Sequence, residues 1–238
     1  MENILEVKGV GKNFGGFTAL SDVNLSIRKG ERLGLIGPNG SGKTTLISCI
    51  SGALQNDGGT IRFNGESIET LPAYARTRRG IARSFQIPRP FASMTVLENL
   101  MVPLAYVGGL SGSKARAQGL EILDEMGLAE KAESSSASLS QVELRKMELA
   151  RAMEAKPQLL ISDEAMAGLS GSEVDDVLDI LIKLNKQGIT IIMIEHIMHA
   201  VMRFSERIIC LDAGQIICDG DPKTVVGNPQ VQRAYFGD

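Results

Sequence analysis

The sequence lacks several features that would place it in a specialised class of protein. Three cysteines occur in 238 residues, and none of them stands in a CxxC spacing. This argues against a disulfide framework and a zinc knuckle, and it favours a reducing compartment. Apolar runs such as residues 189–194 end well before the roughly 20 residues that a membrane-spanning helix needs. No signal-peptide pattern opens the chain, so we expect a cytoplasmic protein with no membrane span of its own.

An excess of basic charge is also missing. The chain has 25 lysines and arginines against 28 acidic residues, a formal net charge of −3. We therefore expect no nucleic-acid partner, because such binding relies on counterion release from phosphates. One local basic cluster is present, and we expect it to be a solvated face. It consists of Arg76, Arg78, Arg79, Arg83 and Arg89.

The residues that are present have the composition of one folded domain. The hydrophobic fraction is 43% and the charged fraction 22%, an ordinary globular mixture. Short apolar stretches predict strands early in the chain, and strands alternate with helices from residue 158 onward. Such alternation predicts a parallel sheet covered by helices. The predicted strands are 4–7, 23–27, 32–36, 60–63, 159–162, 189–194 and 207–211, and the predicted helices are 43–51, 172–186 and 196–204, with a further helical region from 95 to 155.

A glycine-rich loop joins the strand at 32–36 to the helix at 43–51. Residues 37–44 match the phosphate-binding pattern GxxxxGK[ST] in full. The glycines let backbone N–H groups face phosphates, Lys43 reaches the β- and γ-phosphates, and Thr44 offers a hydroxyl to magnesium. A plain glycine-rich turn is the alternative, but the flanking strand and helix are the setting that the motif needs. The predicted nucleotide contacts are Gly37, Pro38, Asn39, Gly40, Ser41, Gly42, Lys43, Thr44 and Thr45.

Two adjacent acids, Asp163 and Glu164, follow the predicted strand at 159–162. In a phosphate-loop ATPase the first acid holds magnesium, and the second orients and polarises the attacking water. Alone, the pair would also fit a surface turn whose acids cap the next helix. Together with the phosphate loop, it predicts a metal ligand at Asp163 and catalysis at Glu164.

These motifs resemble the ABC transporter ATPases, and the resemblance covers nearly the whole chain. Within that family the chain is most similar to the branched-chain amino acid importer ATPases, on residues 12–20, 79–86, 94–100 and 228–237. The resemblance implies an α/β P-loop NTPase with a mostly parallel core sheet flanked by helices, an N-terminal antiparallel β region and an inserted helical subdomain. In this division of the single domain 1–238, residues 1–86 and 157–238 form the nucleotide-binding core and residues 87–156 the helical subdomain.

The resemblance implies roles for three more side chains. Phe14 lies where the family stacks an aromatic ring on adenine, although core packing is its alternative. Gln86 resembles the glutamine that touches magnesium and the transmembrane subunits, although a surface residue after a strand would look the same. His196 resembles the histidine that senses the γ-phosphate. The order EHxxH around it matches neither zinc-enzyme pattern, HExxH or HxxEH, so we expect no metal there.

The signature segment departs from the family. The family reads LSGGQ, whereas residues 139–143 read LSQVE. In the family this segment brings a helix N-terminus to the γ-phosphate held by the opposite subunit, which requires bare backbone and a positive dipole. Val142 adds a branched side chain and Glu143 a negative charge. Ser140 and Glu143 also fit a capping box, which is a purely structural role.

Two further positions that serve a partner's nucleotide also depart. Ala165 replaces the proline that usually follows the catalytic glutamate, and Ser170 replaces the acid or amide that contacts the other subunit. Features that serve this chain's own nucleotide are intact. We therefore predict an asymmetric pair with a different ATPase subunit.

The sequence as a whole predicts the ATPase subunit of an ABC importer that uses ATP and Mg²⁺. It binds separate transmembrane permease subunits at the inner face of the membrane and powers uptake of amino acids, branched-chain ones by the resemblance. The segment 86–91 has two prolines, so we expect a loop that touches the permease. Two alternatives stay open: a soluble ABC ATPase outside transport, and a weakly hydrolysing regulatory cassette. The predicted catalytic residues are Lys43, Glu164 and His196, the metal ligands are Thr44, Gln86 and Asp163, and Phe14 and Gln86 join the loop at the nucleotide.

Overall fold

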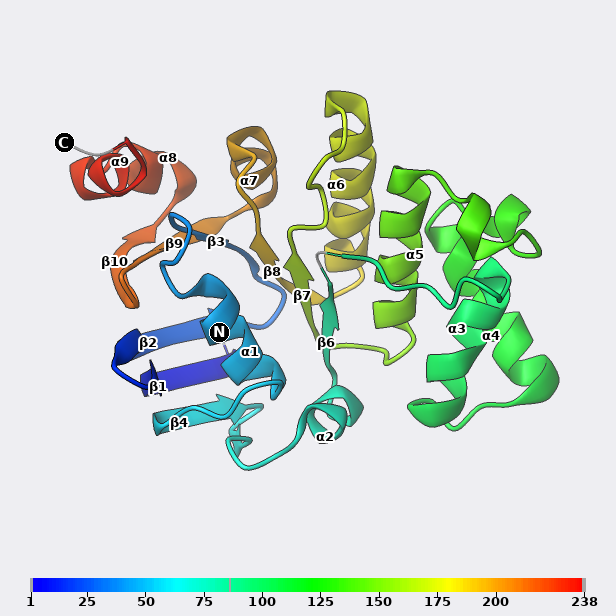
Figure 1. Ribbon diagram of the computed structural model, residues 1–238, viewed down its shortest axis with the longest axis horizontal. Helices are drawn as coiled ribbons and strands as arrows, with labels where there is room; N and C mark the ends of the chain where they lie inside the picture. Colours follow the sequence, from blue (N-terminus) through cyan, green and yellow to red (C-terminus); the bar gives the residue numbers. More distant parts are fainter. Residues whose placement is uncertain (1, 86, 237–238) are drawn as a thin grey trace.

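Two β-sheets form the centre of the molecule in the computed structural model, which describes residues 2–85 and 87–236 (Figure 1). The larger sheet has the strand order β10-β9-β3-β8-β7-β6. All neighbouring pairs in it are parallel except β9 with β10. Its strands are β3 (Arg32–Ile36), β6 (Ile81–Ser84), β7 (Leu159–Asp163), β8 (Thr190–Ile194), β9 (Arg207–Asp212) and β10 (Gln215–Gly220).

The smaller sheet is antiparallel and has the order β2-β1-β4-β5. Its strands are β1 (Asn3–Phe14), β2 (Phe17–Arg28), β4 (Gly58–Phe63) and β5 (Glu66–Ser67). The first two are longer than the apolar stretches at 4–7 and 23–27 predicted, because pairing continues through polar residues down to the tight turn at residues 14–17.

Alternation along the central strands divides the core into two layers. Ile192 and Ile194 of β8 belong to the layer shared with α1 (Lys43–Ser51) and the antiparallel sheet. Ile191 and Met193 face the layer built with α6 (Gly171–Lys186) and α7 (Met198–Phe204). Figure 1 shows these two layers on opposite sides of the central sheet. Because both faces are buried, these strands consist of continuous apolar residues.

The chain between β6 and β7 is helical, as the sequence predicted. It contains α3 (Val96–Tyr106), α4 (Gly112–Glu125) and α5 (Gln141–Met153), with 3₁₀ turns at Ala129–Lys131 and Ser136–Ser138. Figure 1 shows these helices beyond the β6 edge of the sheet, on the side away from the antiparallel strands. Three short helices complete the fold: α2 (Ala73–Arg78), α8 (Pro222–Val226) and α9 (Pro229–Phe236).

The predicted fold class is confirmed, including the parallel core, the antiparallel N-terminal region and the inserted helices. Strands β5, β6 and β10 and helices α2, α8 and α9 were not predicted, because each is short. The helix expected at 196–204 begins at Met198, so His196 lies in the turn before it. Among the described residues, no helix has the length and apolar content to cross a membrane.

The basic cluster is not a uniformly solvated face. Arg76 is 1% exposed, and its guanidinium donates to the carbonyls of Cys49 and Ile50 at the end of α1. Those helix-end carbonyls have no partner within the helix, and a guanidinium has enough donors to serve several of them. Arg83 is also largely buried. The prediction of a solvated face is therefore wrong for these two residues.

Candidate active site

Three loops meet where the parallel strands β3, β7 and β8 end. Because the strands run in the same direction, their carboxyl ends lie along one edge of the sheet, where open α/β sheets bind ligands. The phosphate loop follows β3, the acids Asp163 and Glu164 end β7, and His196 follows β8. The fold thus brings together segments that are more than a hundred residues apart.

The phosphate loop has a backbone that tolerates few side chains. Gly42 has φ +104°, and a Cβ atom there would lie 2.6 Å from the carbonyl oxygen of Ala19. Helix α1 follows directly, with no side-chain cap and no acidic residue in its first turn. Its first N–H groups and its positive dipole end are therefore available to an anionic ligand.

Lys43 lies folded over its own loop. Its Nζ donates to the carbonyl oxygens of Gly37 at 2.7 Å and of Pro38 at 3.0 Å. The side chain is buried, and burial lowers the pKa of its ammonium group, while the nearby carboxylates of Glu164 and Asp163 act in the opposite direction. The amine is thus held at the mouth of the loop by bonds that a phosphate oxygen can replace.

Glu164 and His196 contact each other directly. The His196 Nε2 lies 2.9 Å from a carboxylate oxygen of Glu164, although 32 residues separate them in the chain. Glu164 has φ +47°, which is uncommon for a residue with a side chain, and its N–H donates to the carbonyl of Ile194 on β8. The two strands therefore hold the pair of side chains predicted to act in catalysis within hydrogen-bond distance.

Asp163 is paired with an arginine that was not predicted to lie here. The Arg83 Nη2 lies 2.5 Å from Asp163 Oδ2, and Nη1 lies 3.2 Å from the Ser48 hydroxyl of α1. Asp163 and Thr44 line one cavity of about 470 Å³, so a hydroxyl and a carboxylate suited to Mg²⁺ face the same space. Arg83 was missed because β6, which places it beside β7, was missed.

Two further residues hold the turn that follows Glu164, and the sequence did not indicate either of them. Glu195 is 2% exposed and accepts a hydrogen bond from the Met166 N–H at 2.9 Å. Burial raises the pKa of Glu195 to about 7, and the negative charge of Glu164 adds to the effect. Arg145 on α5 donates to the Ala167 carbonyl at 3.2 Å. Both contacts hold the turn that follows Glu164.

A residue of the last helix also reaches the phosphate loop. The Tyr235 hydroxyl on α9 accepts a hydrogen bond from the Gly37 N–H at 2.7 Å, across 198 positions of sequence. Burial raises the pKa of Tyr235 to about 12, so the phenol is neutral near pH 7. The C-terminal region thus helps to hold the first residue of the loop.

Of the two residues outside the loop that were predicted to contact the nucleotide, Phe14 is described by the structure and Gln86 is not. Phe14 ends β1 with half of its surface exposed, and the Lys12 ammonium lies 5.6 Å from the ring centre. An exposed ring of this kind does not fit the core-packing alternative, and half of its surface is accessible to a ligand. Gln86 lies outside the described residues.

The signature segment begins α5 with a complete capping box. The Ser140 hydroxyl accepts from the Glu143 N–H at 3.4 Å, and the Glu143 carboxylate accepts from the Ser140 N–H at 2.8 Å. That backbone hydrogen bond is the main reason why the pKa of Glu143 is lowered. The structural role predicted for these two residues is confirmed, and it places a negative charge in the first turn of α5.

Comparison with known proteins identifies the family. Residues 20–167 match the family described as ABC transporter, and residues 215–238 match the one described as branched-chain amino acid ATP-binding cassette transporter. The chain is 37% identical to the high-affinity branched-chain amino acid transport ATP-binding protein BraF of Pseudomonas aeruginosa, over 99% of this chain and 98% of BraF.

Two solved structures extend the likeness to the fold. One is the ADP conformation of MJ1267, an ATP-binding cassette of an ABC transporter, with a TM-score of 0.92 and 31% identity over the full length of both chains. The other is a dimeric post-hydrolysis state of the ATP-binding cassette MJ0796 bound to ADP and phosphate. Its TM-score is 0.82 and its identity 28%, over 92% of this chain and 98% of MJ0796. The chain therefore belongs to the ABC transporter family, in which it is a nucleotide-binding ATPase cassette.

Proposed function

We propose that the chain is the ATPase subunit of an importer of branched-chain amino acids, bound to permease subunits at the cytoplasmic face of the membrane. The observation that carries the choice of solute is the match of residues 215–238 to the branched-chain cassettes, because it lies outside the general ATPase motifs. BraF, a transport protein, is similar over nearly the whole chain. This similarity does not favour an ATPase outside transport.

Nucleotide binding follows from the phosphate loop. The phosphates lie over the uncapped start of α1, and the adenine stacks on the exposed ring of Phe14. Lys43 exchanges its bonds to the Gly37 and Pro38 carbonyls for bonds to phosphate oxygens, which are stronger because both partners are charged. The backbone N–H groups of Asn39, Gly40 and Gly42, with those of Thr44 and Thr45, supply the remaining donors.

Hydrolysis is assigned to the pair Glu164 and His196. Glu164 orients the attacking water and accepts its proton, while His196 holds the carboxylate in place and faces the γ-phosphate. Thr44 and Asp163 would hold a Mg²⁺ ion, and Gln86 is the further ligand that the resemblance predicts. The ion neutralises charge on the phosphates when it is bound.

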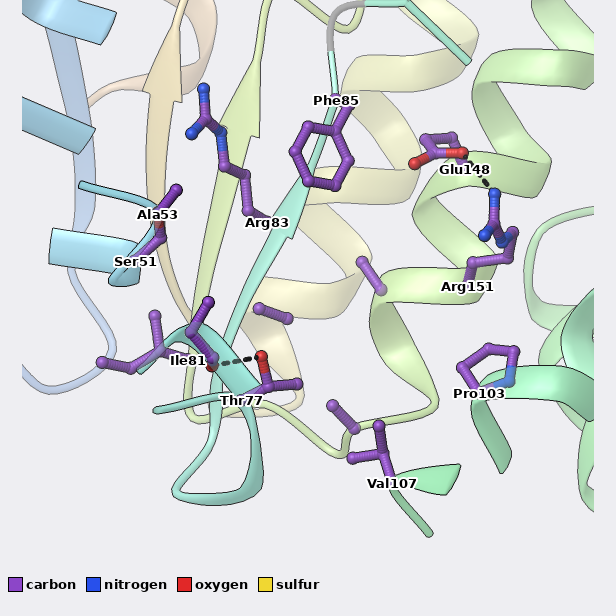
Figure 2. Close-up of a pocket in the computed structure, with 14 residues that line it drawn as sticks. Ser51, Ala53, Thr77, Ile81, Arg83, Phe85, Pro103, Val107, Glu148 and Arg151 are labelled. Atoms are coloured by element: carbon purple, nitrogen blue, oxygen red, sulfur yellow. Dashed lines mark hydrogen bonds and ion pairs between the residues drawn. The ribbon is translucent and has the colours of Figure 1, made fainter. Parts of the chain in front are cut away.

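The transport partner docks, in this proposal, in a cleft between β6 and the helices of residues 87–156, which we regard as the helical subdomain. Figure 2 shows this cleft, which encloses about 240 Å³. Phe85 and Arg83 lie on the β6 side, Glu148 and Arg151 on α5, and Pro103 on α3 (Figure 2). Nearby Ile87 and Phe91 of the two-proline loop are 66% and 41% exposed. Apolar surface of this kind beside paired charges suits a protein partner.

We further propose that the chain works in a dimer with a different cassette. MJ0796 is dimeric, and in such a dimer each ATP lies between one phosphate loop and the other signature helix. In this chain Glu143 uses the Ser140 N–H and adds a carboxylate at the helix start. A dimer of two identical copies would have this poor signature at both sites. A partner with an intact signature would restore one active site.

The proposal is tested with the complete transporter in proteoliposomes. Glu164→Gln should bind ATP within about threefold of the wild type but turn over about 10²–10⁴-fold more slowly, because only the proton acceptor is lost. Labelled leucine, isoleucine and valine should accumulate with the wild type and not with Glu164→Gln. Labelled lysine should accumulate with neither protein. Glu121→Gln, on the exposed surface of α4, is the matched control. ATP-driven uptake of lysine in place of leucine would disprove the choice of solute.

A further inference from the structure

Arg83 occupies a place that its surroundings in the sequence do not explain. It stands within a run of basic residues, yet its side chain is only 12% exposed, and the Asp163 side chain beside it 8%. The guanidinium bridges two elements, since it bonds Asp163 on β7 and Ser48 on α1. A buried carboxylate requires a compensating positive charge. In this structure, Arg83 supplies that charge.

The same carboxylate is the proposed ligand of Mg²⁺. Arg83 Nη2 lies 2.5 Å from Asp163 Oδ2, so the guanidinium occupies the space beside an oxygen that a metal ion or its bound water needs. A guanidinium and a divalent cation cannot both lie against this oxygen, and two positive charges so close together repel each other. Binding of the metal at this oxygen therefore requires Arg83 to release it.

Arg83 has other contacts that can hold it after release. Its guanidinium carbon lies 5.4 Å from the centre of the Phe85 ring, which stabilises a cation independently of Asp163. Both Arg83 and Phe85 line the cleft of Figure 2 as well as the cavity that contains Thr44 and Asp163. The side chain thus stands where the cleft meets the metal site.

We propose that Arg83 is a positioning residue that neutralises Asp163 in the metal-free state and competes with Mg²⁺ for that carboxylate, moving toward Phe85 and the cleft when Mg²⁺ and nucleotide bind. This inference rests on the proposed role of Asp163 as a metal ligand. It raises the Mg²⁺ concentration that nucleotide binding requires above the concentration that the ligands alone would need. In the wild-type protein, binding of the metal must also break the ion pair between Arg83 and Asp163.

The test is a titration of Mg²⁺ at a fixed concentration of a fluorescent ATP analogue, with parallel binding curves in EDTA. In Arg83→Gln the half-saturating Mg²⁺ concentration should fall about tenfold, because the competing state is removed. Binding in EDTA should weaken, because Asp163 then repels the phosphates. A merely structural role would weaken binding in both conditions and leave the Mg²⁺ midpoint unchanged or raised, and that result would overturn the inference.

Two further variants guard against misfolding and general charge effects. Arg83→Lys keeps the charge without the forked donor, so its midpoint should lie between those of the wild type and Arg83→Gln. A midpoint above that of the wild type would contradict the inference. Arg79→Gln makes the same charge change at an exposed position outside that cavity, and it should leave the midpoint unchanged.

A fourth variant separates this inference from the proposal beneath it. Asp163→Asn should lose most of the Mg²⁺ dependence of nucleotide binding. If Asp163→Asn keeps the wild-type dependence, the metal assignment is wrong, and the inference fails with it. If Asp163→Asn loses the dependence while Arg83→Gln keeps the wild-type midpoint, the metal assignment holds and the role of Arg83 alone is wrong.

Discussion

Helices α1 and α5 differ in how the N–H groups of their first turns are used. Helix α1 follows Gly42 and has neither a side-chain cap nor an acid in its first turn. Helix α5 follows Ser140, whose hydroxyl accepts the N–H of Glu143, while the Glu143 carboxylate accepts the N–H of Ser140. One helix start leaves its donors for a ligand, and the other satisfies them within the chain.

An uncapped helix start leaves its N–H groups to an anion, whereas a capping box engages them within the chain. A capping box stabilises a helix by about 1 kcal/mol, and a phosphate site forgoes that stabilisation. In α1 the lost stability is offset by burial of Leu46, Ile47 and Ile50 between the two sheets. In α5 the stabilisation is kept, and its start is correspondingly unsuited to a phosphate.

The largest effect is expected when α1 is made to resemble α5. Thr45 is the third helical residue of α1, as Glu143 is of α5. Thr45→Glu should weaken ATP binding by at least about 100-fold, because it puts a carboxylate beside the bound phosphates. Calorimetric titration with ATP measures this loss.

The matched control for this change is Thr45→Gln. Glutamine has the size of glutamate without its charge, so this variant should lose much less affinity for ATP. The free energy of unfolding of nucleotide-free Thr45→Glu should stay within about 1 kcal/mol of the wild type, since an acid in the first turn of a helix is favourable. Near-normal ATP affinity in Thr45→Glu would break the comparison between the two helices.

The reverse change makes α5 resemble α1. Replacing Gln141, Val142 and Glu143 by Gly, Gly and Gln should raise ATP turnover of the isolated chain about tenfold or more, since each ~1.4 kcal/mol of transition-state stabilisation is tenfold in rate. The same variant should lose about 1–2 kcal/mol of stability, mainly through the two added glycines and partly through the weaker capping box. Steady-state phosphate release and urea unfolding measure the two effects.

The control uses a second capping box, formed by Thr95 and Glu98 at the start of α3. Glu98→Gln weakens the same kind of motif away from the signature segment, so it should lower stability without raising turnover. An isolated wild-type chain that hydrolyses ATP as fast as the triple variant would show that the altered signature is harmless. The proposal of an asymmetric pair would then be wrong.

The smallest effect concerns the charge of Glu143 alone. The hydrogen bond from the Ser140 N–H and the nearby Lys131 hold the pKa of Glu143 below its ordinary value of 4.5. The carboxylate therefore stabilises the fold fully above pH 4.5, and this contribution is lost as the pH falls through the lower folded-state pKa. Glu143→Gln should cost about 0.5 kcal/mol at pH 7. Urea unfolding at pH 7 and pH 3 should show the difference shrinking at the lower pH, and an equal difference at both would contradict the electrostatic origin.

Local patterns were predicted well where the chemistry is local. The helix Lys43–Ser51 was predicted to the residue, because a phosphate loop and an apolar run delimit it. The capping box of Ser140 and Glu143 was predicted from a spacing of three residues. The helix expected from residue 196 was set too early, because the apolar period did not show that the chain turns at His196 before α7 begins.

Contacts across the sheet escaped the sequence for a physical reason. Arg83 meets Asp163 because β6 and β7 are parallel neighbours that place Arg83 opposite Ile161. Arg145 on α5 likewise reaches the carbonyl of Ala167, which lies 22 positions further along the chain. No spacing within the chain encodes such distances, and a basic run is most often a solvated face, so Arg83 was assigned to the surface.

The sequence by itself determined the phosphate loop, the acidic pair after β7 and the altered signature, because each is a pattern of neighbouring residues. Only the tertiary structure decided that His196 meets Glu164, that Tyr235 holds Gly37 from the other end of the chain, and that Arg83 neutralises Asp163. Each of those contacts depends on strand order and register. Burial of both faces of the central sheet sets that order, and local composition leaves it open.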